Sequence, residues 1–550
     1  MLCLIRSPIS LESPSHRKFT LTRLIPLQRL ILALAVSAPV CAQAHVADLT
    51  HGSVGAGDCF AMAIAIEGAD AVLAAPYKGP KSRGRAWVYD AISGLPRYAL
   101  IPSNSNPSDT FGLAVAVHGG LAAVSAATDQ NGLNSGSVFL FDLQTGNELF
   151  EFRAWDGAAG DLFGQGLAMG PGRLVVAAPG ADVGEVDCGA LYVFETQSGN
   201  LLKKVVAKRP RPGMRLGMRL GLDGAHVVAS ANWDKPDLGR GTVYVFDLFG
   251  GKQMHKLDAK NGQAGDSFGG SLAVGGGRVL IGAPSSDQGP LEDMGKAYLF
   301  DLTTGAELMY LPPPPNIVED DRFGSAVALA DGLLLVSAPG ADAAGLDLGS
   351  VHLLDSQTGA PLGEFAHFGL QNGDRFGTRL AASGARALVG MPFASPVAVA
   401  SGEAHLFCLL RDLGQPYCGP GAPNSTGMPA LMGAYGADEV ACGQFQLAAS
   451  QLPPAKPALA LASQAMDWVP FLGGGQGHLC LGGSIGRFRM DVGYTDPDGT
   501  FYVPIDLDNL PLPLPPRVVP GDTWYFQLWF RDKNPAQTSN LTTGLRVQFQ

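Results

Sequence analysis

The stretch GDSFGGSLAVGGGRVLIGAP, from Gly265 to Pro284, decides the fold, because a close copy, GDLFGQGLAMGPGRLVVAAP, occurs from Gly160 to Pro179. Taken alone, its glycines would fit a loop that cradles a phosphate. A phosphate loop occurs once in a chain and opens onto a helix, whereas this segment recurs and leads into β-branched residues. The segment is therefore a structural repeat.

The repeat has seven copies, each carrying two markers. A Phe-Gly pair or a close variant recurs every 51 to 55 residues, at Phe60, Phe111, Phe163, Leu216, Phe268, Phe323 and Phe376. A glycine before an aromatic-rich run follows in every copy, at Gly84, Gly136, Gly189, Gly241, Gly295, Gly349 and Gly402. Each copy holds about four strand candidates separated by turns, and small four-stranded sheets stacked in a ring make a β-propeller. We expect an all-β protein with a seven-bladed β-propeller at residues 45–413.

The seventh copy ends after EAHLFCLLRDL without its own fourth strand. The segment His45–His51, HVADLTH, lies just before the first copy, in register with the missing strand. We predict that this segment pairs into the last blade, which ties the two ends of the ring together and covers two open sheet edges.

The N-terminus reads as an export signal. Basic residues precede the apolar run Leu30–Ala42, and Ala42-Gln43-Ala44 offers the small residues that signal peptidase needs. We interpret residues 1–44 as a signal peptide, with a membrane anchor or buried helix as the alternative, and expect a secreted or cell-surface protein. No later segment has roughly 18 uninterrupted apolar residues, so no membrane span is expected after cleavage.

Composition narrows the class of partner. Only 16% of the 550 residues are charged, while 73 are Gly and 40 are Pro, which favours short strands and tight turns over long helices. Without residues 1–44 the chain has 33 Lys and Arg against 48 Asp and Glu, a net charge of −15. This balance argues against nucleic acid or anionic membrane as a partner, since phosphate binding needs a cationic surface. A monomer is expected.

Six cysteines follow the signal peptide, at Cys59, Cys188, Cys408, Cys418, Cys442 and Cys480. They form no CxxC pair, which argues against a zinc site, and export makes disulfides plausible. Cys418 and Cys480 are the preferred pair because both lie in the tail, although spacing alone leaves the connectivity open.

The period disappears after residue 413. Residues 414–550 begin with the linker-like GQPYCGPGAPNSTG and continue with short alternating strand candidates. We expect a small C-terminal β-sandwich-like domain at residues 414–550.

The fifth copy spells Phe268-Gly269 and Gly282-Ala283-Pro284. Over about Gly57–Leu413 the chain resembles the FG-GAP repeats of integrin α-chain propellers and their bacterial relatives. The resemblance implies a propeller that serves adhesion, recognition or scaffolding. In the tail, YCGPGAPNSTG and PGDTWYFQLWFRD are similar to a C-terminal module of large secreted bacterial repeat proteins, which implies a surface or export context.

Two sets of aspartates are candidates for chemistry. One set lies two residues before the Phe position, at Asp58, Asp109, Asp161, Asp266, Asp321 and Asp374, and we expect these carboxylates to accept backbone N–H groups in their turns. The other set lies in loops after the Ala-Pro element, as Asp182 with Asp187, Asp234 with Asp237, Asp287 with Asp293, and Asp342 with Asp347. Calcium prefers six to eight oxygen ligands, so these loops are candidate calcium sites. None spells the D-x-[DN]-x-D-G pattern of integrin-type calcium loops, and solvated turns are the alternative.

No catalytic constellation is evident. Ser267 and Ser484 lie in G-x-S-x-G matches, but Ser267 occupies a variable turn position, and no histidine follows Ser484. Neither an HExxH motif nor a close His/carboxylate cluster indicates a metalloenzyme. We expect a non-catalytic recognition or adhesion module that binds an extracellular protein or carbohydrate through loops at the channel mouth. The alternative is a secreted hydrolase or lyase that uses the propeller as a scaffold.

Overall fold

The computed structural model describes residues 44–550 apart from 105, 107, 129–133, 232–238, 331, 343–345, 366–368, 419–421, 471–476, 513–516 and 534–537. Within these residues the regular elements are β-strands and three short helical turns, η1 (Lys78–Ser82), η4 (Val440–Cys442) and η6 (Arg489–Asp491). The expected all-β class is therefore confirmed.

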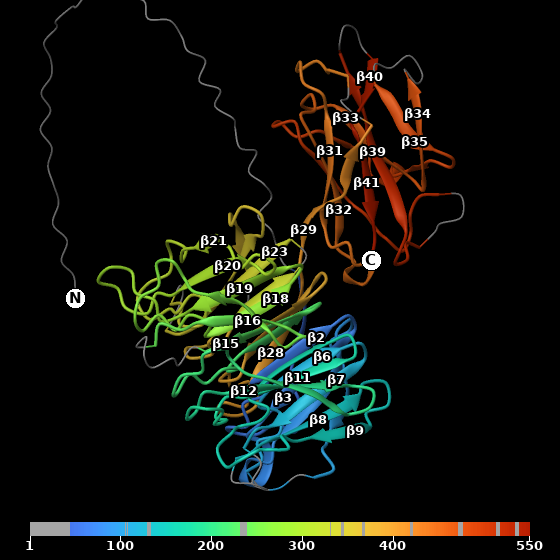
Figure 1. Ribbon diagram of the computed structural model, residues 1–550. Helices are drawn as coiled ribbons and strands as arrows, with labels where there is room; N and C mark the ends of the chain where they lie inside the picture. The colour runs from blue at the N-terminus through green and yellow to red at the C-terminus, as the bar shows by residue number, and fades with distance from the viewer. Residues whose placement is uncertain are drawn as a thin grey trace, which may run out of the picture. The chain divides into compact units, whose positions relative to one another are not determined.

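In the described residues from 44 to 408, seven sheets of four antiparallel strands follow one another in a propeller-like arrangement (Figure 1). Sheet 1 consists of β2 (Ala63–Glu67), β3 (Asp70–Ala75), β4 (Arg85–Asp90) and β5 (Pro96–Leu100). Sheet 2 consists of β6 (Val115–His118), β7 (Leu121–Ala126), β8 (Ser137–Asp142) and β9 (Glu148–Phe152). Sheet 3 consists of β10 (Gly166–Gly170), β11 (Arg173–Ala178), β12 (Ala190–Glu195) and β13 (Leu201–Val205).

The remaining four sheets have the same order of strands. Sheet 4 consists of β14 (Leu220–Asp223), β15 (His226–Ser230), β16 (Val243–Asp247) and β17 (Gln253–Leu257). Sheet 5 consists of β18 (Ser271–Gly275), β19 (Arg278–Ala283), β20 (Lys296–Asp301) and β21 (Glu307–Leu311). Sheet 6 consists of β22 (Val327–Ala330), β23 (Leu333–Ala338), β24 (Ser350–Asp355) and β25 (Pro361–Glu364). Sheet 7 consists of β26 (Arg379–Ser383), β27 (Arg386–Met391), β28 (Glu403–Cys408) and the N-terminal β1 (Ala44–Leu49).

The inner strands form because their sequences are apolar on both faces. In β12 five consecutive residues, Ala190–Phe194, are buried, and successive residues of a strand point to opposite faces. Tyr192 of this strand shares a hydrophobic cluster with Leu140 of β8, so neighbouring sheets pack face to face. Burial of both faces is what stacked sheets require.

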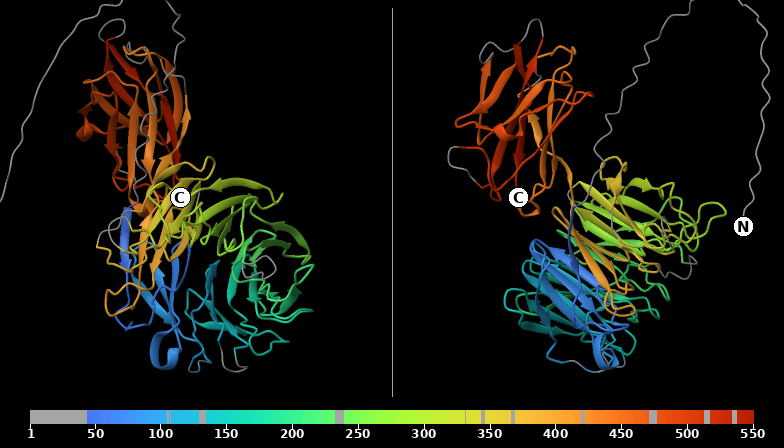
Figure 2. Two further views of the ribbon diagram at one scale, coloured as in Figure 1. Left: turned by 90° about the vertical axis from the view of Figure 1, so that its left-hand side faces the viewer. Right: turned by 180° about the vertical axis from the view of Figure 1, so that it is seen from behind.

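The first strands of the sheets line the centre of the ring. β2 contacts β6, the contacts continue in chain order through β10, β14, β18, β22 and β26, and β26 contacts β2. In the left view of Figure 2 the sheets follow one another around a common centre in the same order, from blue through green to orange. The first strands therefore close a ring.

A glycine forms each seam between sheets. The seven marker glycines, Gly84 to Gly402, have φ from +81° to +89°, where glycine is favoured. A Cβ at any of them would lie 2.0–2.6 Å from a backbone atom of the Phe, or of Leu216, that opens the next sheet. At each seam the amide of that residue also donates to the carbonyl before the glycine. Gly402 meets Phe60 in this way, so the seventh sheet joins the first.

The predicted pairing of the N-terminal segment is confirmed. β1 runs antiparallel to β28, with Asp48 opposite His405 and the buried Leu49 opposite Ala404. Its register shifts between His45 and Ala47, as it does between the third and fourth strands of the other six sheets. β1 therefore occupies the fourth-strand position of sheet 7.

Residues 411–550 add further sheets. A four-stranded sheet consists of β29 (Arg411–Leu413), β31 (Leu431–Gly436), β32 (Phe445–Ser450) and β38 (Phe501–Pro504). A larger sheet consists of β30 (Gln415–Tyr417), β41 (Gly544–Gln548), β39 (Thr523–Asp532), β33 (Pro457–Ser463) and β36 (Gly486–Arg487), with β37 (Gly493–Tyr494) and β40 (Thr538–Leu541) at its sides. A separate hairpin pairs β34 (Ala465–Pro470) with β35 (His478–Gly482).

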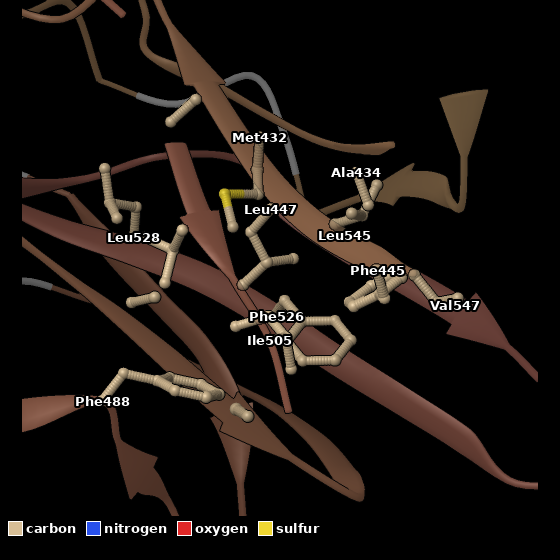
Figure 3. Packing of buried hydrophobic residues seen from close by; sticks show 14 of the residues in the cluster. Met432, Ala434, Phe445, Leu447, Phe488, Ile505, Phe526, Leu528, Leu545 and Val547 are labelled. Atoms are coloured by element: carbon tan, nitrogen blue, oxygen red, sulfur yellow. The ribbon is translucent and has the colours of Figure 1, made fainter. Parts of the chain in front are cut away.

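These two sheets share one hydrophobic core. Met432 and Leu447 of the four-stranded sheet pack in the same cluster as Phe526 and Val547 of the larger one, as Figure 3 shows. The rings of Phe445 and Phe526 lie 5.4 Å apart. The core therefore holds the two sheets together.

Two disulfides are present. The expected Cys418–Cys480 bond is confirmed. Cys408 and Cys442 form a second bond, which sequence spacing did not indicate, and it joins the end of β28 to η4. The thiols of Cys59 and Cys188 are free and buried.

The seam contact predicts a large cost for Gly402→Ala. The new Cβ would lie 2.2 Å from the Phe60 carbonyl oxygen, and we expect a loss of about 3–4 kcal/mol in the free energy of unfolding, measured by urea titration. Gly384→Ala is the matched control, because Gly384 lies in the turn between β26 and β27 of sheet 7, with φ +54° and open space around it. The control should lose about 1 kcal/mol. Equal losses in the two variants would contradict the role of the seam.

Candidate functional site

The third residue after each marker Phe or Leu faces the centre of the ring. It is small in five copies, which carry Ala63, Ala114, Gly166, Ser271 and Ala326. The other two copies carry arginine, Arg219 in sheet 4 and Arg379 in sheet 7. All seven residues line one cavity, the mouth of the central channel. The two arginines are therefore exceptions at a position where the fold favours small side chains.

Both guanidinium groups donate to backbone carbonyls. Arg219 Nε donates to Gly270 at 3.2 Å, and Arg379 Nε donates to Met62 at 2.7 Å. Each bond reaches from the arginine's own sheet to the start of the next one. No Asp or Glu of the described residues forms an ion pair with either arginine, so both positive charges lack a carboxylate partner.

The pKa values of both arginines are lowered, as expected for charges without a carboxylate partner among the described residues. Burial lowers the pKa of Arg219, and burial together with the charge of Arg219 lowers the pKa of Arg379 to about 10. The Arg219 side chain is exposed to water in the channel, and protein surrounds that channel. The desolvation cost of its charge is therefore smaller than it would be in a dry core. Both side chains remain cations at neutral pH. Both charges therefore act in the same cavity.

The channel mouth has the size and the lining of a ligand site. Its cavity measures about 390 Å³, within the range of small-molecule sites. Besides the arginines, its polar lining consists of Tyr77, Gln165, Ser271, Ser325 and Thr378. The described lining residues include no Asp, Glu, His or Cys. The cavity therefore offers cations and hydroxyl groups, which suit an anionic group.

A neighbouring hollow extends this surface. It measures about 520 Å³, shares Arg379 with the channel mouth, and adds Arg322, Arg375, Phe393 and the acidic residues Asp320 and Asp347. The Arg375 guanidinium lies 5.9 Å from the centre of the Phe393 ring, and its Nη2 pairs with Asp347 at 2.7 Å. Arg322 likewise pairs with Asp293, so a longer ligand that continues from the channel meets a surface of mixed charge with one aromatic ring.

The aspartates before the marker Phe have the expected structural role. All six accept a hydrogen bond from the backbone amide three residues earlier, and the acceptors are Asp58, Asp109, Asp161, Asp266, Asp321 and Asp374. Burial raises the pKa of Asp161 and Asp321. These carboxylates stabilise the turns that lead into the first strands.

The candidate calcium loops already use their carboxylates within the protein. Asp182, Asp287 and Asp342 accept the amides of Asp187, Asp293 and Asp347 at 2.7–3.0 Å. The second aspartate of each pair contacts an arginine of the next sheet, with partners Arg215, Arg322 and Arg375. Asp234 and Asp237 lie outside the described residues. Calcium binding at these loops stays a prediction.

The two G-x-S-x-G matches lie in turns. Ser267 has φ +58°, and its hydroxyl donates to the carbonyl of Gly265 at 3.3 Å. Ser484 lies between β35 and β36. Neither serine follows a strand that leads into a helix, which is the geometry of a hydrolase nucleophile.

Sequence reasoning missed Arg219 and Arg379. The signal was available, because aligning the seven copies on the marker Phe shows arginine at a position that is otherwise Ala, Gly or Ser. A residue that departs from a structural pattern at a crowded position is a candidate for function.

The isolated charge of Arg379 predicts that its removal stabilises the protein without ligand. The lowered pKa means that the charged form is disfavoured in the fold at every pH below about 10. With an allowance for channel water, we expect Arg379→Gln to raise the free energy of unfolding at pH 7 by about 1 kcal/mol, measured by urea titration. A loss of stability would show that the bonds of Arg379 to Met62 and Thr378 outweigh its charge.

The calcium hypothesis predicts a higher Tm in about millimolar Ca²⁺ than in EGTA, and predicts that Asp287→Asn removes the difference. If the carboxylates serve only the contacts described above, the wild-type Tm will be the same in both buffers. Differential scanning calorimetry distinguishes the two results.

Comparisons with known proteins agree with this architecture. Four segments match the family model described as FG-GAP repeat, at residues 98–141, 149–194, 252–300 and 314–354. No curated protein matches the chain in sequence. No helix in the described residues is long and apolar enough to cross a membrane. The four matched segments are FG-GAP repeats, and the four-stranded sheets in which they lie agree with a propeller-like β fold.

Proposed function

We propose that this protein is a secreted or cell-surface recognition module without catalytic activity, which binds a ligand bearing carboxylate or sulfate groups at the channel mouth. In this proposal the seven sheets are the blades of a closed seven-bladed propeller, and residues 414–550 are a β-sandwich-like domain. The main support for this proposal is the pair Arg219 and Arg379. These two cations line one cavity and have no carboxylate partner among the described residues.

The chemistry of the pair favours an anionic ligand. A guanidinium presents N–H donors in a planar fork that matches the two oxygens of a carboxylate or sulfate, and hydrogen bonds between charged groups are about twice as strong as neutral ones. The protein carries a net charge of −11, so the protein as a whole does not attract an acidic ligand. Recognition of such a ligand would depend on the local positive charge of the two arginines. Tyr77 and Phe393 add aromatic surface beside the arginines, which suits the ring of a sugar.

The cavity also supports a binding role over hydrolysis. General acid and base groups are most often His, Asp or Glu, and the described lining of the channel mouth has none. One catalytic alternative has a specific observation in its favour. A lyase that cleaves acidic sugars by β-elimination could neutralise the substrate carboxylate with Arg379, which shares the cavity with Tyr77. Tyr77 as the phenolate would take the proton beside that carboxylate, a carbon–carbon double bond would form, and the glycosidic oxygen would leave and be protonated.

Isothermal titration calorimetry with polygalacturonate, heparin and neutral dextran tests the proposal. We expect binding of an acidic polymer and none of dextran. Arg219→Gln and Arg379→Gln should each weaken binding by about 10-fold to 100-fold, the value of one charge-assisted hydrogen-bonded contact.

Arg209→Gln is the control for this titration. Arg209 lies in a different basic hollow, with Lys208, Arg211 and Lys256, and its removal changes the net charge equally. Equal losses in all three variants would show non-specific attraction and contradict the proposal. Release of unsaturated sugars from polygalacturonate, lost in Tyr77→Phe, would replace the binding role with the lyase.

A further inference from the structure

We propose that His45, Asp48 and His405 form a site for a divalent transition metal of the zinc type, which fastens the N-terminal strand to the last sheet. His45 and Asp48 lie on β1, and His405 lies opposite Asp48 on β28. Their ligating atoms all lie within 4.8 Å of one another. The site uses no cysteine, so the absence of CxxC pairs has no bearing on it.

The two nitrogens have the spacing that one metal ion requires, and the carboxylate oxygen lies closer to each of them, at hydrogen-bond distance. His45 Nε2 lies 2.8 Å from Asp48 Oδ1, His405 Nδ1 lies 2.7 Å from the same oxygen, and the two nitrogens are 3.4 Å apart. Zinc bonds of about 2.0–2.2 Å in tetrahedral geometry place neighbouring ligand atoms roughly 3.3 Å apart. Small shifts of the Asp48 carboxylate would therefore admit the ion.

The donor set selects the class of metal. Two imidazole nitrogens and one carboxylate oxygen suit zinc and its neighbours in the first transition series, whereas calcium and magnesium prefer oxygen ligands alone. Three protein ligands leave a fourth position for water. His45 and Asp48 are exposed, so that position faces solvent and the ion has a path of entry.

The rings are held in place by packing. His405 is buried, and its ring lies 6.0 Å from that of Phe376. The ring of His45 meets the edge of Phe407 at 5.3 Å. Side chains fixed by their neighbours lose less freedom when they bind an ion.

Sheet 6 provides an internal comparison. His352 occupies the position of His405, and His352 Nδ1 lies 3.1 Å from the carboxylate of Glu364 on the fourth strand. Within the described residues, the only group of three candidate ligands is the one in sheet 7, where the fourth strand comes from the other end of the repeat region. The third candidate ligand therefore occurs in sheet 7, where the third strand β28 and the fourth-position strand β1 are far apart in the chain.

Sequence reasoning found no close cluster of histidine and carboxylate that indicates a metalloenzyme, whereas the structure brings His45, Asp48 and His405 together. His45 and His405 are separated by 360 residues, and only the pairing of β1 with β28 brings them together.

Calorimetric titration of the exported protein with Zn²⁺ alone, after treatment with EDTA and with a purification tag free of histidine, tests the proposal. We expect one equivalent to bind and to raise the Tm by about 3 °C at a hundredfold excess over Kd. Asp48→Asn and His45→Gln should each weaken binding at least tenfold. Both side chains are exposed, so these variants should fold.

Glu364→Gln is the matched control, because it removes the equivalent carboxylate from the sheet 6 pair and should leave Zn²⁺ affinity unchanged. Co²⁺ bound to the wild type should show the intense visible absorption of a tetrahedral site. This measurement needs no variant protein. Absence of Zn²⁺ binding, binding that survives both sheet 7 variants, or preference for Ca²⁺ over Zn²⁺ would overturn the proposal.

Discussion

The fold depends on one backbone contact that is made seven times. In each copy a glycine at positive φ lies against the backbone of the Phe or Leu that opens the next sheet, and the amide of that residue donates across the seam. A side chain on the glycine would collide with backbone atoms, which have nowhere to move in a packed ring. The spacing between sheets is thus set by main-chain geometry, while the side chains of the second and third strands fill the space between sheets.

The ring geometry explains both candidate sites. Because the first strands converge on one channel, the position after the Phe-Gly corner is crowded and carries small residues in most copies. Arginine at two such positions places a charge without a carboxylate partner among the described residues, although each guanidinium donates to a backbone carbonyl at the start of the next sheet. The pairing of β28 with β1 differs from the strand pairing in the other six sheets. Only in this pair do the third and fourth strands of a sheet come from opposite ends of the repeat region. The disulfide between Cys408 and Cys442 joins the end of β28, the strand that pairs with β1, to η4.

Much of the fold could be predicted from the sequence because the determining features repeat locally. The Phe and Gly markers revealed the sheets, the aspartates before the marker Phe act within their own turns, and the unpaired edge of the seventh copy indicated the role of His45–His51. The functional residues were harder to find. Arg219 and Arg379 become visible only when the copies are aligned, and the histidines of sheet 7 meet only through strand pairing across 360 residues. Cys442 likewise meets Cys408 only in the folded chain, which no spacing rule describes.

The proposed function requires that the channel mouth binds an anionic group at Arg219 and Arg379. Crystals grown with selenate, measured at the selenium absorption edge, test it most directly, because the anomalous signal identifies the anion by its element. We expect a peak in the channel within hydrogen-bond distance of Arg219 or Arg379. A channel without such a peak, or one in which carboxylates neutralise the two guanidinium groups, would contradict it.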